Sequence, residues 1–247
     1  MKKLINKTAI VTGGAQGFGR AIAEKLAEEG AFVNIFDKGC CAETLKLIKD
    51  AGNNAAAHKV NIADSSEVES AVKKIIEATG VDILINNAGV VSAHENLLSV
   101  TDDIWDREIA VNLSGTFYCC RAVLDHMIEK KSGKIVNISS IAGATGRNQT
   151  SPAYSAAKAG VYGLTMSIAK SVAKHGVNVN AIAPGMIWTD MLSVYPKEAT
   201  DKGFSEIPFA RAGRPEDVAN AVLFLVSDES GFITGARMHL NGGAWMG

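Results

Sequence analysis

The sequence of 247 residues lacks an excess of charge of either sign, since its formal net charge is −1. Acidic and basic residues are interspersed, so neither a nucleic acid nor an anionic membrane is an expected partner. No apolar run approaches the length of a membrane span, and the apolar stretch near the N-terminus is too short for a signal peptide. We therefore expect a soluble, cytoplasmic protein whose partners are small molecules and protein subunits.

Cysteine and histidine are too few and too scattered to suggest a metal site. The four cysteines form two adjacent pairs, Cys40 with Cys41 and Cys119 with Cys120, without CxxC spacing, so free thiols are expected. The five histidines show no HExxH or similar spacing. No repeat, low-complexity tract or linker is present, and a 47% hydrophobic content suits one large core. The sequence therefore predicts a single domain over residues 1–247.

A strand, a glycine turn, a helix and a second strand follow one another at the start of the chain. The apolar run Lys7–Thr12 leads into TGGAQGFG at residues 12–19, and a helical pattern covers Arg20–Glu29. The second apolar run, Ala31–Phe36, ends beside Asp37. This order predicts a βαβ unit with an acidic residue at the end of its second strand.

The glycine spacing is that of a dinucleotide-binding turn. Gly13 permits the tight turn, Gly17 lets the backbone approach a pyrophosphate, and Gly19 lets helix and strand pack closely. Asp37 would accept hydrogen bonds from the hydroxyl groups of the adenosine ribose. Glycines also serve ordinary turns, but the strands, the helix and the acid all fall where the fingerprint needs them, which favours nucleotide binding.

Strands and helices continue to alternate after this unit, which predicts an α/β fold with a parallel sheet covered by helices on both faces. The expected strands are residues 55–60, 82–86, 134–139, 177–182 and 234–240, and the expected helices are residues 41–50, 65–79, 101–131, 152–168 and 214–227.

The segment at about residues 186–208 has no clear period and is expected to be irregular. A long irregular segment with bulky apolar residues inside a compact domain is commonly a lid over a binding site, although an ordinary surface excursion would look the same. The residues expected to form a partly apolar pocket are Trp188, Met191, Leu192, Tyr195 and Phe204, with His94 and Gln149 from other loops.

Tyr154 and Lys158 stand four residues apart, one turn from each other on the same face of the expected helix, so the ammonium group can act on the phenol. Such a spacing also arises by chance. Ser140 ends a strand just upstream, and Asn112 lies in the interior of the expected helix 101–131. Asparagine is a poor residue for that position, so either it is solvated or its amide is used.

Together these motifs resemble the short-chain dehydrogenase/reductase family, of the compact single-domain type. The resemblance implies a doubly wound, seven-stranded parallel sheet (a Rossmann fold), a nicotinamide cofactor, reversible alcohol/carbonyl chemistry and a homotetramer. The matching motifs, in the family's order, are residues 12–19, Asn86–Gly89, Asn112, Ser140, Tyr154–Lys158 and Pro184–Thr189.

The resemblance also implies roles for individual residues. Tyr154 corresponds to the general acid/base, and Lys158 to the cation that lowers the tyrosine pKa. Ser140 corresponds to the residue that polarises the substrate oxygen, although the adjacent Ser139 competes for this assignment. Asn112 corresponds to the asparagine that holds a water linking the lysine to solvent.

The same resemblance favours NAD over NADP as the cofactor. Asp37 would repel a ribose 2′-phosphate, and Gln16 stands where NADP-preferring relatives often have a basic residue. Lys38 is a counter-signal that leaves room for NADP. The other positions expected to contact the cofactor are Gly13, Gly17, Phe18, Gly19, Asn61, Ile62, Asn87, Tyr154, Lys158, Ile187 and Thr189.

The leading hypothesis is an NAD-dependent oxidoreductase that interconverts a secondary alcohol and a ketone. The first alternative is a 3-oxoacyl-thioester (acyl-carrier-protein) reductase, which the chain resembles at Arg20–Glu24 and Arg211–Glu216. Binding of a carrier protein would require a basic patch near the pocket. A non-catalytic nucleotide-binding redox sensor is the second alternative, but it would be expected to have lost Ser140, Tyr154 or Lys158. The residues that could form the basic patch are Lys130, Lys131, Lys134 and Lys174.

Overall fold

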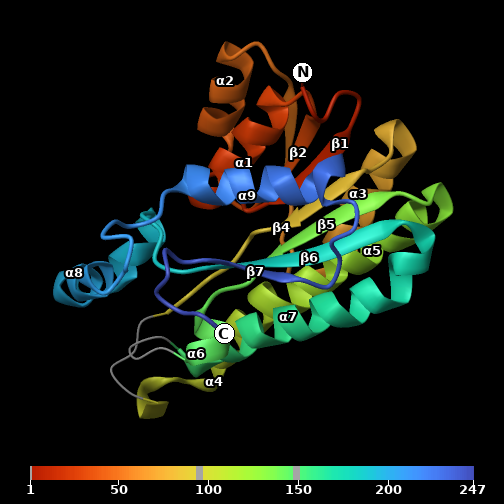
Figure 1. Cartoon of the computed structure of the whole chain (residues 1–247). Helices are drawn as coiled ribbons and strands as arrows, with labels where there is room; N and C mark the ends of the chain where they lie inside the picture. Colours follow the sequence, from red (N-terminus) through yellow and green to blue (C-terminus); the bar gives the residue numbers. More distant parts are fainter. Residues whose placement is uncertain (1, 93–96, 147–150) are drawn as a thin grey trace.

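Seven parallel strands form one sheet in the order β3-β2-β1-β4-β5-β6-β7. The computed structural model describes residues 2–92, 97–146 and 151–247 (Figure 1). The order reverses between β1 and β4, which makes the carboxyl ends of these two strands a topological switch point. The expected seven-stranded parallel sheet is confirmed. The strands are β1 (Thr8–Thr12), β2 (Phe32–Asp37), β3 (Ala55–Lys59), β4 (Ile83–Asn86), β5 (Gly133–Ile138), β6 (Val177–Pro184) and β7 (Arg237–Leu240).

Helices cover both faces of the sheet. α1, α2 and α9 pack on one face, and α3, α5 and α7 pack on the other (Figure 1). The main helices are α1 (Gly17–Glu28), α2 (Ala42–Asp50), α3 (Ser65–Thr79), α4 (Asp102–Ile109), α5 (Gly115–Lys130), α6 (Ala142–Thr145), α7 (Pro152–Val172), α8 (Lys197–Ser205) and α9 (Pro215–Val226). Short helical turns are η1 (Leu97–Ser99), η2 (Ala110–Ser114), η3 (Ala173–His175), η4 (Asp190–Val194) and η5 (Asp228–Ser230).

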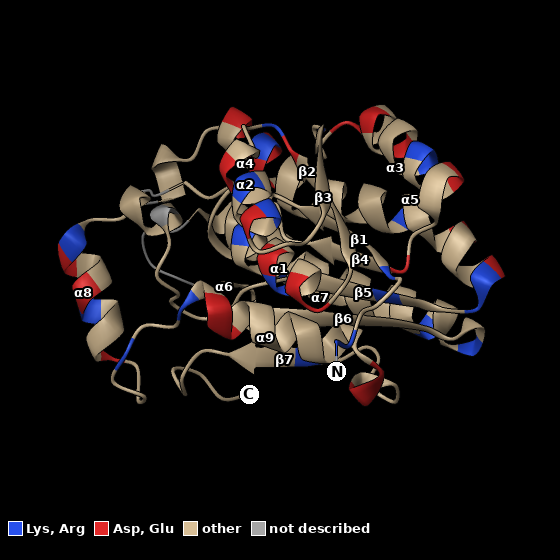
Figure 2. Cartoon of the chain, turned by 90° about the horizontal axis from the view of Figure 1, so that it is seen from above, with Lys and Arg blue, Asp and Glu red and all other residues tan. Residues whose placement is uncertain are grey.

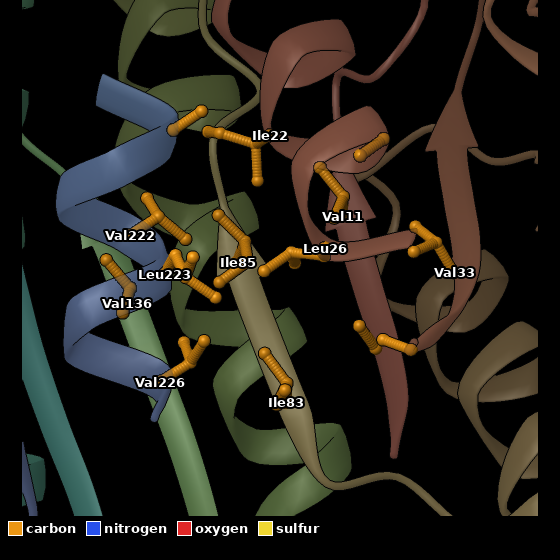
Figure 3. Packing of buried hydrophobic residues seen from close by; sticks show 14 of the residues in the cluster. Val11, Ile22, Leu26, Val33, Ile83, Ile85, Val136, Val222, Leu223 and Val226 are labelled. Atoms are coloured by element: carbon orange, nitrogen blue, oxygen red, sulfur yellow. The ribbon is translucent and has the colours of Figure 1, made fainter. Parts of the chain in front are cut away.

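Side chains of each central strand alternate between the two helical layers. In β4, Ile83 and Ile85 pack with Leu26 of α1 and Val222 of α9 (Figure 3), whereas Leu84 faces the α3, α5 and α7 side. Each of these side chains is at most 1% exposed, and burying one stabilises the fold by about 1.5–3 kcal/mol. The strands therefore read as continuous apolar runs, as strands buried on both faces do.

The segment at residues 186–208 is not irregular, so that expectation was wrong. It contains the 3-10 turn η4 and the helix α8, whose Lys197 pairs with Asp201 one turn later. Within α8 the buried residue is Thr200, so the helix buries no apolar stripe that periodicity could detect. Figure 2 shows basic and acidic residues mixed along this helix.

The last strand is shorter than expected and begins at Arg237 rather than Thr234. The Thr234 hydroxyl accepts a hydrogen bond from the Val179 backbone at 3.1 Å, and Gly235 has a φ of +72°. A left-handed residue ends the extended conformation, so the chain turns before the strand begins.

The expected helix 101–131 is interrupted by the π-helical turn η2 around Asn112. The Asn112 side chain is fully buried and holds the loop after β4, because Oδ1 accepts from Val90 N (3.1 Å) and Nδ2 donates to Val90 O (2.8 Å). Nδ2 also donates to Glu108 O at 2.9 Å. Of the two explanations for an asparagine here, the structure selects use of the amide.

Glu108 at the end of α4 is completely buried, and its carboxylate oxygens find no hydrogen-bond partner within the described part of the chain. An unpaired buried carboxylate is destabilising, and an apolar residue of similar size avoids its desolvation penalty. We expect Glu108→Leu to raise the free energy of unfolding by about 1–3 kcal/mol in a denaturant titration. Glu108→Gln keeps two polar atoms and should gain less. A loss of stability in Glu108→Leu would show that the carboxylate is held by an internal water or another partner.

Candidate active site

The glycine turn lies at the carboxyl ends of β1 and β4 and leaves no space for side chains. A Cβ on Gly13 would stand 2.7 Å from the Ala88 Cα, and Gly13 has a φ of +70°. A Cβ on Gly19 would stand 2.0 Å from the Gly13 carbonyl oxygen and 2.6 Å from Asn87 Nδ2. The close packing of helix on turn that the spacing predicted is therefore present in the structure.

Gly17 is required by its backbone conformation, because its φ is +55° while the nearest neighbour of a Cβ would be Thr189 at 3.7 Å. It opens α1, whose N-cap residue Gln16 makes no side-chain cap among the described residues. The first turn of α1 also contains no acidic residue. Its backbone N–H groups and dipole thus suit an anion, so the turn fits the pyrophosphate of a dinucleotide.

Asn87 fastens the turn to β1. Its Nδ2 donates to Thr12 O (2.9 Å) and Gly13 O (3.1 Å), and its backbone N–H donates to the Thr12 hydroxyl (3.0 Å). The Ala88 N–H donates to the same hydroxyl at 2.9 Å. Asn87 borders the cavity described below, but its amide is committed to shaping the turn.

Asp37 lies at the end of β2, where its carboxylate is held by two backbone groups. Oδ2 accepts from Ala15 N at 3.0 Å, and Oδ1 accepts from Gly39 N at 2.8 Å. These bonds orient the carboxylate at the rim of the cavity beside Lys38. It is placed where an acid would meet the ribose hydroxyls of a bound dinucleotide.

A cavity of about 850 Å³ brings most of the predicted residues together. Gly19 and Asn112 stand behind its wall, where they pack against residues that line it. The predicted residues that line the cavity are Gly13, Gln16, Gly17, Phe18, Asp37, Asn61, Ile62, Asn87, Ser140, Tyr154, Lys158, Ile187 and Thr189.

Three of the expected pocket residues, Met191, Leu192 and Tyr195, also line this cavity. Trp188 instead stacks on Phe204 with ring centroids 5.2 Å apart and borders an adjoining cavity of about 600 Å³. His94 and Gln149 lie outside the described residues.

Several lining residues were not predicted. Arg20 directly follows Gly19, and Val111 directly precedes Asn112, so their proximity to predicted residues could have identified them. Glu43 carries no such signal, because the packing of α2 beside the glycine turn brings it to the cavity. Cys40 reaches the cavity in the segment that follows Asp37 and Lys38. All four cysteines are free thiols.

Lys158 is buried between the Tyr154 helix and β5. Its Nζ donates to the Ile138 carbonyl at 2.8 Å and lies 5.6 Å from the centroid of the Tyr154 ring. The side chain is only 4% exposed, and this burial lowers the pKa of Lys158 from 10.5 to about 8. The amine is thus close to its titration point at neutral to mildly basic pH.

The two adjacent serines are used differently. The Ser139 hydroxyl is buried and donates to the Lys158 carbonyl at 2.8 Å, which ties β5 to α7. The Ser140 hydroxyl accepts from Ala142 N at 3.1 Å and is partly exposed at the cavity. Among the residues that the structure describes, Ser140 is thus the serine of this pair whose hydroxyl hydrogen is not already donated to another group.

The lowered pKa of Lys158 predicts a pH-dependent stability of the ligand-free protein. Between pH 8 and 10.5 the unfolded chain binds the proton and the folded chain does not, so folding stability rises with pH across this window. Relative to Lys158→Met, wild-type stability should rise by about 3 kcal/mol from pH 7.5 to 10.5. Denaturant titrations of both proteins over this range measure the difference. A constant difference would mean that Lys158 has an ordinary pKa.

Within the described residues there is no group of three or more His, Cys, Asp or Glu side chains that could hold a metal ion. Nor does any described helix have the length and apolar character needed to cross a membrane.

The chain is similar over almost its whole length to known proteins. A family model described as enoyl-(acyl carrier protein) reductase matches residues 13–244. The 3-oxoacyl-[acyl-carrier-protein] reductase FabG of Staphylococcus aureus (strain N315) is 40% identical over 98% of this chain and 99% of its own. The protein of the same name from Haemophilus influenzae is 40% identical over 97% and 98%.

Solved structures share the fold as well. A protein assigned as a 2-deoxy-D-gluconate 3-dehydrogenase from Agrobacterium tumefaciens, solved with bound NADP, has a TM-score of 0.90 at 37% identity. The alignment covers 98% of this chain and 97% of that one. Levodione reductase has a TM-score of 0.89 at 32% identity and covers 97% and 98%. The likeness therefore extends over the whole chain.

Proposed function

The chain belongs to the short-chain dehydrogenase/reductase family, and from this premise we propose that Ser140, Tyr154 and Lys158 are its catalytic residues. The protein is an NAD(P)-dependent oxidoreductase that interconverts a secondary alcohol and a ketone. One observation carries the residue assignment: all three side chains line the cavity that also contains the glycine turn and Asp37.

Each proposed role follows from the chemistry of the side chain. A bound nicotinamide dinucleotide supplies or accepts the hydride. In the direction of reduction, the Tyr154 phenol gives its proton to the carbonyl oxygen, which the Ser140 hydroxyl holds and polarises by a hydrogen bond. The Lys158 ammonium favours the phenolate that remains, since a phenol near pKa 10 is otherwise a poor base at neutral pH. In oxidation the same groups remove the proton from the alcohol.

The other site residues are proposed to position these groups and the dinucleotide. Ser140 is preferred over Ser139, because the Ser139 hydroxyl is already donated to the Lys158 carbonyl. Asn112 holds the loop after β4 against the helix and stands near Lys158 through Gly89, since a Cβ on Gly89 would lie 2.7 Å from Asn112 Oδ1 and 3.5 Å from Lys158 Nζ. This position is compatible with a water that links the lysine to solvent.

NAD is proposed as the preferred cofactor. Asp37 is held at the rim by Ala15 and Gly39, where a 2′-phosphate would meet its negative charge. Gln16, a neutral residue, borders the same cavity. Two observations favour NADP instead: Lys38 also lines the cavity, and the Agrobacterium relative was solved with bound NADP.

The substrate is proposed to be a free small molecule rather than an acyl group on an acidic carrier protein. The lysines considered as a docking patch lie at the amino edge of the sheet: Lys130 pairs with Asp82 just before β4, and Lys134 is the second residue of β5. Ser140 follows the opposite end of β5. The C-terminal end of α5, where Lys130 lies, is far from α8 in Figures 1 and 2. The names of the FabG relatives keep the carrier-bound substrate as the second candidate.

Acidic residues also stand beside the cavity. Asp102, Asp103 and Asp106 are exposed on α4, the helix whose Arg107 lines the cavity. An acidic partner would approach these carboxylates at a cost in charge repulsion.

A panel assay that follows NADH and NADPH absorbance tests the function. Purified protein would be supplied with secondary alcohols, small ketones and 3-oxoacyl thioesters, free and carrier-bound. Faster turnover of small ketones with NADH is the expected result. Carrier-bound thioesters turned over best would favour the second candidate, and dinucleotide binding without any turnover would favour the redox sensor.

Three further points are proposed with the function. Residues 186–208 form a lid, supported by Met191, Leu192 and Tyr195 at the cavity, within a single domain of residues 1–247.

A homotetramer is supported by Phe117 of α5 and Met166 of α7, which are 40% and 44% exposed on neighbouring helices. A cytoplasmic location is compatible with four cysteines that remain thiols.

A further inference from the structure

Arg20 lines the cavity beside the glycine turn, and its guanidinium is paired with Glu43. Both side chains line the cavity together with Asp37 and Lys38. Arg20 Nη2 donates to Glu43 Oε2 at 2.8 Å, and Nη2 and Nε donate to the Ala15 carbonyl at 2.8 and 3.2 Å. The cation at this rim is therefore engaged by a carboxylate from α2.

The peptide groups of Ala15 connect Arg20 to the carboxylate proposed to bind the ribose. The Ala15 N–H donates to Asp37, while its carbonyl accepts from Arg20 and, at 3.3 Å, from the Thr44 hydroxyl. Thr44 is fully buried and also donates to Gly14 O at 2.9 Å, so α2 is fixed on the turn. Arg20 and Asp37 are thus held on the two sides of one residue of the glycine turn.

An arginine at this place is the group that a ribose 2′-phosphate would recruit, because a guanidinium matches phosphate oxygens with paired hydrogen bonds. Lys38 is a second cation at the same rim. The site therefore has enough positive charge for a 2′-phosphate, and a preference for NAD needs another cause. A 2′-phosphate would have to displace the Glu43 carboxylate from Arg20 and would meet it as a like charge. NAD lacks this phosphate and leaves the pair undisturbed.

We propose that Glu43 is a specificity-determining residue, which disfavours NADP by engaging Arg20. This inference rests on the proposed binding of a dinucleotide in this cavity and adds to the repulsion by Asp37 a second contribution from another element. Without Glu43, the Ala15 carbonyl still holds the Arg20 guanidinium, and the donor that Glu43 engaged becomes available to the 2′-phosphate of NADP.

Dissociation constants for NADH and NADPH, measured by isothermal titration calorimetry on the full chain, test the proposal. Glu43→Gln should tighten NADPH about tenfold and leave NADH within about twofold. The pair is exposed and contributes little to stability, so this variant should fold normally. Glu69→Gln is the matched control, because Glu69 pairs with Arg121 at 2.6 Å in a similar exposed pair outside the cavity. It should not change the ratio of the two constants.

Arg20→Gln, alone and combined with Glu43→Gln, separates the release of Arg20 from a general loss of negative charge. The combined variant should lose the gain in NADPH affinity, and the ratio of constants cancels any distortion of the turn that affects both dinucleotides. An unchanged ratio in Glu43→Gln, or a gain that survives the loss of Arg20, would overturn the proposal. The wild-type ratio separately tests the NAD preference: a protein that prefers NADPH contradicts that preference, while the change in ratio still decides on Glu43.

Discussion

Turnover of Tyr154→Phe should fall by about 10²–10⁴-fold, the usual contribution of a positioned general acid/base, while its dissociation constant for NADH stays nearly unchanged. The substitution removes only the phenolic oxygen. The ring remains available for its contact with Lys158, whose Nζ lies 5.6 Å from the centroid. Single-turnover kinetics with NADH and a ketone from the substrate panel, beside a separate binding titration, measure the two effects.

Tyr162→Phe is the matched control for this change, because Tyr162 stands on the same helix and its ring packs on Arg237 at 4.4 Å, away from the cavity. Its turnover should be unaffected. The catalytic assignment fails if Tyr154→Phe loses NADH binding instead of turnover, since the residue would then act in the structure of the site. A pH profile distinguishes the two as well, because loss of the acid/base group should remove a titration from the turnover profile.

Gly19→Ala should weaken dinucleotide binding about 100-fold. The new Cβ would stand 2.0 Å from the Gly13 carbonyl oxygen and 2.6 Å from Asn87 Nδ2. Neither group can move away without distorting the turn, because one is backbone and the other donates hydrogen bonds to the turn. Such overpacking costs about 3 kcal/mol. If the turn moves to relieve it, NADH binding weakens about 100-fold, at 1.4 kcal/mol for each tenfold change. Calorimetric titration and a denaturant titration measure the binding and the stability.

Gly163→Ala provides the control, because a Cβ on this helical glycine of α7 would meet nothing within 4 Å. It should raise stability by up to about 1 kcal/mol through helix propensity and leave NADH binding unchanged. Normal binding by Gly19→Ala would mean that the turn tolerates displacement and that its tight packing is not needed for the dinucleotide.

The elements predicted best are those with a clear apolar pattern. The helix at residues 65–79 has the predicted ends, and the central strands lie within a residue or two of theirs, because a core-facing pattern of apolar residues marks their length. Prediction failed for α8 because this helix buries Thr200 and no apolar stripe. It also failed to find the π-helical turn at Asn112, because hydrogen-bond register is not encoded in apolar periodicity.

The site divides in the same way. The glycine turn and the pair formed by Tyr154 and Lys158 could be read from the sequence, because their residues meet within one turn or one helical repeat. Arg20 and Glu43 are 23 residues apart and belong to different helices, so no local sequence pattern predicts their ion pair. The sequence also cannot show where the lysines considered as a docking patch lie. The fold places them at the amino edge of the sheet, opposite the edge that carries the cavity.

The sequence alone determined the order of strands and helices, the glycine turn, the position of Asp37 and the helical spacing of the proposed catalytic pair, because each depends on backbone sterics or on residues close in the chain. Only the tertiary structure decided which serine presents its hydroxyl to the cavity, how deeply Lys158 is buried and what engages Arg20. Those features depend on desolvation and on contacts between distant segments, which exist only once the two helical layers have packed on the sheet.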